Sequence, residues 1–162
     1  MSNSSCVFST PKLYIYLKQT FAFDSRWNFC FPLMCLTFVF FIKEDNPLPC
    51  FVMNSGNWDI KTKIPQQCTV SGIEVPSYFK EWINLKDVYL NFYRRRATGM
   101  MTMMRELGIS MLGSHHLGID DAKNIARVLQ RMLSDGARLQ ITARRSPNHR
   151  GDVEFFFKNR IR

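Results

Sequence analysis

The sequence predicts an α/β domain in which helices pack against a sheet. From Leu48 onward, short apolar runs of strand length alternate with longer segments of helical periodicity, which is the order of elements in layered α/β proteins. The chain has 162 residues, of which 46% are hydrophobic and 14% aromatic. This length suits one domain or part of one, and this composition can fill a core, which excludes a wholly disordered chain.

Residues 1–49 form an atypical N-terminal segment. Its apolar run at 29–42 has 14 residues and contains Pro32, whereas a membrane-spanning helix needs roughly 20 apolar residues. We therefore expect no stable membrane insertion. Residues 36–42 are rich in β-branched and aromatic side chains and predict a buried strand. Residues 1–19 are serine-rich and free of acidic residues, which weakly resembles an organelle import signal.

The regular succession of elements lies in residues 50–140. A strand at 50–53 is followed by a helix beginning near Asp59, which we expect to be short or kinked because Pro65 has no amide proton. Residues 119–133 form the clearest helix, since their apolar positions recur with helical spacing. The other expected elements are strands at 82–85 and 139–142 and helices at 87–96 and 98–107.

The positive charge is concentrated in the second part of the chain. Residues 1–50 carry 4 basic and 3 acidic residues, a net of +1, whereas residues 51–162 carry 18 and 10, a net of +8. This excess favours a polyanionic partner, although a solvated basic surface is the alternative, and residues 141–162 are expected to form a basic tail. The five cysteines contain no Cys-x-x-Cys pair. A reducing compartment, cytoplasmic or nuclear, is therefore expected.

Two adjacent acidic residues begin the helix at 119–133 and occupy different faces of it. Asp120 lies on the polar stripe, where acidic residues favour the helix dipole. Asp121 lies on the apolar stripe, where a carboxylate is costly unless a cation, a metal ion or several donors meet it. Asp121 is therefore a candidate ligand, with a helix cap as the alternative. The polar stripe comprises Asp120, Asn124, Arg127 and Arg131, and the apolar one Asp121, Ile125, Val128 and Leu129.

A second candidate carboxylate, Asp59, follows the buried strand at 50–53. Loops at strand ends are where α/β proteins place functional groups. Mg²⁺ binds carboxylate oxygens, and two such ions about 4 Å apart activate water in phosphodiester cleavage. A nearby histidine is a natural base for that water. Trp58 could stack on a nucleotide base, but packing at the strand end is the stronger expectation, as it is for Trp82 and the methionines between 100 and 111.

Three segments, in this order, resemble the second and third motifs of the DEDDh 3′–5′ exonucleases. The relatives indicated are the Eri-type exoribonucleases (the histone-mRNA 3′-exonuclease group), and the resemblance covers about residues 50–140. It implies a partial RNase H-like fold, a mixed sheet with flanking helices, and hydrolysis of RNA from single-stranded 3′ ends with two Mg²⁺ or Mn²⁺ ions. The segments are Gly56-Asn-Trp-Asp59, Trp82-Ile-Asn-Leu85 and His116-Leu-Gly-Ile-Asp-Asp121-Ala-Lys-Asn-Ile-Ala126.

The resemblance also assigns residue roles. By position, Asp59 and Asp121 correspond to metal ligands and His116 to the general base. His115 and Asp120 have the same spacing as His116 and Asp121, so spacing alone does not choose between the pairs. The family pattern His-x-Gly-x-Asp-Asp selects the second pair.

The family's first motif, an Asp-x-Glu at the end of its first strand, is absent upstream of Asp59. The acidic residues there are Asp24, Glu44 and Asp45, and the single Asp-x-Glu of the chain lies at 152–154. We therefore expect the first strands to be missing or replaced, the remaining sheet to expose an edge that favours self-association, and the chain by itself to have little or no nuclease activity. The alternative function is a non-catalytic remnant that binds RNA or pairs with a complete homologue.

Overall fold

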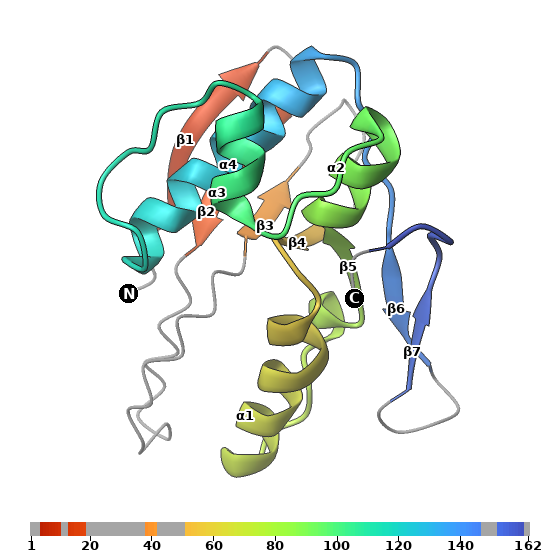
Figure 1. Cartoon of the computed structure of the whole chain (residues 1–162). Helices are drawn as coiled ribbons and strands as arrows, with labels where there is room; N and C mark the ends of the chain where they lie inside the picture. Colours follow the sequence, from red (N-terminus) through yellow and green to blue (C-terminus); the bar gives the residue numbers. More distant parts are fainter. Residues whose placement is uncertain (1–3, 11–12, 19–37, 42–50, 147–151, 161–162) are drawn as a thin grey trace.

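The computed structural model contains one mixed sheet of seven strands, in the order β1 to β7 (Figure 1). It describes residues 4–10, 13–18, 38–41, 51–146 and 152–160. The predicted α/β class is confirmed. The strands are β1 Ser4–Thr10, β2 Leu13–Lys18, β3 Phe38–Phe41, β4 Phe51–Asn54, β5 Glu81–Asn84, β6 Ala143–Arg145 and β7 Val153–Phe155; the helices are η1 Asp59–Lys63, α1 Ile64–Val70, η2 Ser77–Phe79, α2 Leu85–Tyr93, α3 Met100–Glu106 and α4 Gly118–Ser134.

Strands β4 and β5 are the parallel pair of the sheet, with Val52 opposite Trp82, and every other neighbouring pair is antiparallel. The chain returns from β4 to β5 through η1, α1 and η2. The helix expected near Asp59 is present. It begins as the π-helical turn η1 and continues as the short α1, which has Pro65 in its first turn, where a missing amide proton costs nothing.

The two central strands divide the core into two parts, because successive side chains of a strand point to opposite faces. Met53 and Ile83 face α2, α3 and α4, in the larger cluster. Val52 and Trp82 face α1 and η2, in the smaller one. Figure 1 shows α2, α3 and α4 gathered in one part of the molecule and α1 projecting from another. Trp82 is fully buried, as predicted.

Strands β1, β2 and β3 stand in the sheet ahead of β4 and replace the expected first strands. β3 pairs antiparallel with β4, so β4 has a partner on both sides. The prediction of an exposed edge at the surviving strands is therefore wrong for β4. β1 to β3 contain neither Asp nor Glu. Of the apolar run at 29–42, the structure describes only strand β3. Asp24, Glu44 and Asp45 lie outside the described residues.

Several boundaries differ from the predicted ones for local reasons. α2 begins at Leu85, which had been assigned to a strand, because Asn84 caps the helix by accepting from the Lys86 amide at 3.1 Å. The last strand pair begins at Ala143, after the predicted strand at 139–142. Residues 141–162, predicted as a basic tail, include β6 and β7, and β6 pairs with β5.

The methionine-rich helix α3 contributes to the core only on one side. Met100, Met103 and Met104 are buried, as predicted for adaptable core residues. Met101 and Met111 are exposed, so the prediction is wrong for these two. The helix spacing explains the exposure of Met101, because positions 100, 103 and 104 share one face, whereas Met111 lies beyond the end of the helix. Within the described part of the chain, no helix combines the length and apolar character of a membrane span.

Candidate functional site at the start of helix α4

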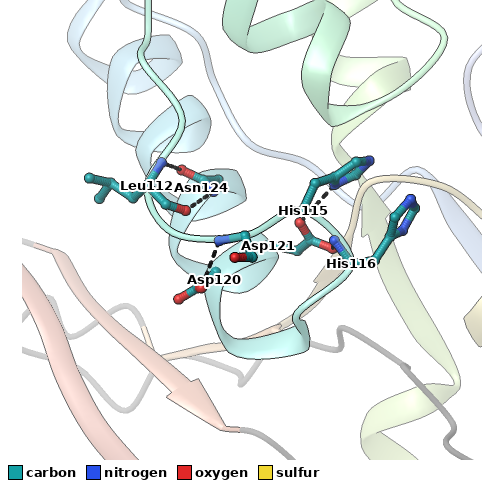
Figure 2. A network of polar contacts seen from close by, with 7 residues as sticks. Leu112, His115, His116, Asp120, Asp121 and Asn124 are labelled. Carbon is teal, nitrogen blue, oxygen red and sulfur yellow. Dashed lines mark hydrogen bonds and ion pairs between the residues drawn. The ribbon is translucent and has the colours of Figure 1, made fainter.

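The loop between α3 and α4 is held against α4 by polar side chains of that helix. Asn124 accepts from the Leu112 amide and donates to the Leu112 carbonyl, each at 2.9 Å (Figure 2). Arg127 donates to the carbonyl of Ser110. Asn124 is fully buried, so its predicted place on the solvent face is wrong. The loop itself covers that face, which helical periodicity alone does not reveal.

Asp120 stabilises the same loop one turn earlier. Its Oδ2 accepts from the Ser114 amide at 3.0 Å, and its Oδ1 lies 3.7 Å from Lys123. The loop makes room for this carboxylate at Gly113, which has φ +68, since a Cβ there would lie 2.0 Å from Oδ2. Asp120 therefore holds the loop through the Ser114 amide, on the outer side of the helix.

Asp121 is buried, with 4% of its surface exposed, and lies on the apolar side of α4, as predicted. Its Oδ1 is 3.0 Å from His115 Nδ1, and its Oδ2 accepts from the His116 amide at 3.1 Å (Figure 2). Both oxygens thus have partners, which offsets the cost of burying the carboxylate. The carboxylate is fixed in place by the loop that it faces.

The two histidines contact Asp121 in different ways. His115 does so through its ring, and His116, the residue selected by the family pattern, does so through its backbone amide. His116 has φ +68, an uncommon value for a residue with a Cβ. The two rings are stacked, with centroids 3.8 Å apart. The contact of the His115 ring with Asp121 is not predicted by the sequence, because the equal spacing pairs His115 with Asp120.

Asp59 lies at the carboxyl end of β4, the place predicted for it. Its Oδ2 accepts from Asn54 Nδ2 at 2.8 Å, and Asn54 is 2% exposed. Arg145 of β6 donates to the carbonyls of Ile60 and Lys61 in the turn that follows. Burial lowers the pKa of the Arg145 guanidinium from its ordinary value. Sequence reasoning missed both supports, Asn54 and Arg145.

The structure brings together some of the candidate residues and not others. One nitrogen each from His115 and His116 and one oxygen from Asp121 lie within 4.8 Å of one another, and among the described residues Asp59 is not in this group. A cavity of about 270 Å³ connects the two regions, because Ser55 lines it together with His115 and Asp121. Asp59 does not line this cavity, and it contacts Asn54, the residue before Ser55.

Trp58 differs from its expected place at the strand end. Its side chain is 61% exposed, so the prediction that it packs is wrong. The Lys63 ammonium lies 4.4 Å from the ring centroid, a distance at which a cation is attracted to an indole face. Aromatic and basic groups also meet on the β6–β7 hairpin, where Arg144 lies 5.3 Å from the Phe156 ring.

A family of known proteins described as exonucleases matches residues 37–129, more than half of the chain. The chain belongs to this exonuclease family. Relatives that match it are named 3′–5′ exoribonucleases, and one solved neighbour is described as a DEDDh family member, in agreement with the family that the motifs predicted. The matched residues include Asp59, His116 and Asp121.

Two curated relatives are similar over a limited part of their length. An uncharacterized exonuclease domain-containing protein of Arabidopsis thaliana is 70% identical over 107 residues, which are 66% of this chain and 32% of the relative. The 3′–5′ exoribonuclease 1 of Rattus norvegicus is 41% identical over 92 residues, 56% of this chain and 27% of the relative. The chain thus spans about a third or less of these relatives.

Solved structures share the fold. A 3′-exonuclease, in a structure described as showing 3′-end specific recognition of a histone mRNA stem-loop, has a TM-score of 0.62 at 20% identity, covering 98% of this chain and 88% of the other. The nuclease domain of a DEDDh family member bound to rAMP has a TM-score of 0.55 at 22% identity, covering 86% and 92%. The predicted mixed sheet with flanking helices is confirmed.

Exonucleases of this family use divalent metal ions. A pair of Mg²⁺ ions needs several carboxylate oxygens around it. In the described residues Asp121 is the one carboxylate of the cluster, its other members being two imidazoles. Strands β1 to β3 offer no Asp or Glu. The donor set that the described residues offer therefore does not fit a two-magnesium centre.

Proposed function

We propose that this chain is the C-terminal part of a 3′–5′ exoribonuclease domain that binds single-stranded RNA 3′ ends and, by itself, hydrolyses them little or not at all. Membership of the exonuclease family and the name of the rat relative support the RNA 3′ end as the ligand. In a complete domain, Asp59 and Asp121 are the candidate metal ligands and His116 the candidate base.

One observation carries the expected loss of hydrolysis. The strands that stand ahead of β4 contain no acidic side chain, so none can add a carboxylate to Asp121. A single carboxylate with two imidazoles supplies too few hard oxygen ligands to hold two Mg²⁺ ions. Without that ion pair, neither the attacking water nor the leaving oxygen is stabilised.

Binding of RNA requires less than hydrolysis does. The cavity beside His115 and Asp121 is lined by Thr98, Gly99 and Thr102, which offer hydroxyl and backbone groups to a terminal nucleotide. The exposed Trp58 ring, with Lys63 at its face, suits stacking on a base next to a phosphate. The net charge of +8 in residues 51–162 favours a polyanion.

The hydrolysis part is tested with 5′-labelled single-stranded RNA, the full 162-residue chain and millimolar Mg²⁺ or Mn²⁺. We expect no shortened products. Shortening that persists in Asp152→Asn, an exposed carboxylate outside the cluster, but stops in Asp121→Asn would overturn the proposal.

The binding part is tested by fluorescence anisotropy of a labelled oligoribonucleotide at several salt concentrations. We expect affinity to fall with rising salt, and Trp58→Ala to weaken binding by about 1–3 kcal/mol, the usual contribution of one stacked base. Phe92→Ala, an exposed aromatic at the end of α2, serves as the matched control and should change affinity little. Equal losses in the two variants, or affinity independent of salt, would contradict the proposed surface.

A further inference from the structure

We propose that His115, His116 and Asp121 form a binding site for one divalent transition-metal ion of the Zn²⁺, Co²⁺ or Ni²⁺ type. In the described part of the chain these side chains make the one group of three possible metal-ligand residues whose ligand atoms lie within 4.8 Å of one another. The proposal goes beyond RNA binding and does not depend on it, since it concerns the ion alone.

The chemistry of the donors selects the class of metal. Two imidazole nitrogens and one carboxylate oxygen are the set that holds zinc in many sites with one position left for water. Imidazole suits Zn²⁺, Co²⁺ and Ni²⁺, whereas Mg²⁺ requires oxygen ligands. The three side chains do not fit a pair of Mg²⁺ ions, but they fit a single ion of the Zn²⁺, Co²⁺ or Ni²⁺ class.

The distances are close to those that such an ion requires. Bonds of about 2.1 Å in a tetrahedral arrangement separate neighbouring ligand atoms by about 3.4 Å. His115 Nδ1 and Asp121 Oδ1 are 3.0 Å apart. The third ligand atom, on the His116 ring, lies within 4.8 Å of them.

The loop and helix α4 organise these ligands in advance. Asp121 is anchored on the helix, with its Oδ2 taken up by the His116 amide, which leaves Oδ1 directed at His115. Side chains of adjacent residues in an extended chain point to opposite sides. Here His116 has φ +68, and the rings of His115 and His116 lie stacked side by side. The turn therefore places two neighbouring imidazoles near one carboxylate, with the His115 ring in direct contact with it.

The site is also accessible. The His115 side chain is 40% exposed, whereas that of Asp121 is 5% exposed. An ion can enter from solvent between His115 and Asp121 and keep an open position toward the cavity at Ser55 and Thr98. This is the arrangement of an open site, in which three protein ligands leave one position for water or an anion.

The test uses the full chain, free of affinity tags, with its cysteines alkylated so that thiolates do not bind the metal. Isothermal titration with Zn²⁺ and Mg²⁺, and the visible absorption of bound Co²⁺, report affinity, stoichiometry and coordination. We expect one Zn²⁺ or Co²⁺ per chain, bound far more tightly than Mg²⁺, and a rise in Tm with Zn²⁺ that Mg²⁺ does not give.

Variants assign the ligands. His115→Ala and His116→Ala should each weaken Zn²⁺ binding by about tenfold or more, as should Asp121→Asn, which keeps an oxygen able to accept from the His116 amide. His149→Ala removes the third histidine of the chain, which is not one of the three proposed ligands, and should leave the affinity unchanged. Zn²⁺ affinity no greater than that for Mg²⁺, or losses equal in the His115 and His149 variants, would overturn the proposal. Because no RNA is present, such a failure is distinct from failure of RNA binding.

Discussion

Asn124 and Leu112 are joined by two hydrogen bonds of opposite direction, each 2.9 Å long. One buried side chain thus replaces the partner strand that the backbone of the loop lacks. Asn124 lies three residues after Asp121 on α4, so the same part of the helix fixes the loop and faces the histidines. The arrangement of the candidate site residues therefore depends on Asn124, which is not one of them.

Replacing Asn124 by alanine should destabilise the protein. Both backbone groups of Leu112, an exposed residue, lose a part-buried bond to the buried Asn124 side chain, at a cost of roughly 1–3 kcal/mol. Urea unfolding measures the loss. Gln130→Ala, a half-buried position of the same helix, is the control and should change stability by about 0.5 kcal/mol or less. Equal losses at the two positions would show that the Leu112 bonds contribute nothing.

Gly113→Ala should be more costly than Gly108→Ala. Both glycines have positive φ, +68 and +66, so both variants bear the same backbone strain. Only at Gly113 does the new Cβ meet the Asp120 carboxylate, whereas nothing lies within 4 Å at Gly108. We expect an additional cost of about 1–3 kcal/mol by thermal unfolding.

The Asp120→Ala background separates the two causes of the Gly113 effect. With the carboxylate removed, Gly113→Ala should cost no more than Gly108→Ala, a coupling that a double-mutant cycle measures. A Gly113 penalty that is unchanged in this background would mean that Asp120 can move away freely, and that its bond to Ser114 does not hold the loop.

The fold was predictable where local pattern and burial agree. The central strands and the long helix α4 follow from apolar periodicity, and the alternation of Val52 and Met53 across β4 matches the two clusters of the core. The burial of Asp121 was predicted in the same way, because a helical face is a local property of the sequence.

Other features depend on contacts between distant segments, which periodicity does not encode. Asn124 was placed on the solvent face, yet the loop from 109 to 116 folds over it. The equal spacings pair His115 with Asp120 and His116 with Asp121, yet the ring that contacts Asp121 is that of His115. The pairing of β3 with β4 likewise joins segments whose relation the motifs do not specify.

Arg145→Met should destabilise the protein far more than Arg144→Met. The Arg145 guanidinium donates to the carbonyls of Ile60, which is buried, and Lys61, which is exposed, so its loss removes a part-buried bond and an exposed one, at roughly 1–3 kcal/mol. Arg144 forms an exposed ion pair with Glu81, whose removal costs about 0–1 kcal/mol. Urea unfolding compares the two neighbours. Similar losses would imply that the turn after Asp59 holds without Arg145.

Alkaline pH should weaken the packing of α2 through two tyrosines. Tyr89 donates to Glu106 and Tyr93 to Asp135, each at 2.6 Å, and burial, then these bonds, raise both tyrosine pKa values. A tyrosine whose pKa is higher in the folded than in the unfolded state stabilises the protein fully at a pH below its unfolded-state pKa of about 10. This stabilisation is lost as the pH rises through the folded-state pKa. Urea unfolding of the wild type should therefore show a free energy of unfolding that declines above about pH 10, and tyrosinate absorbance should rise in parallel.

The control is the double variant Tyr89→Phe/Tyr93→Phe, which has no such protons to lose. Its free energy of unfolding should decline less steeply with pH, whatever its stability at neutral pH. Identical slopes in the two proteins would mean that these hydroxyls ionise as freely in the folded chain as in the unfolded one.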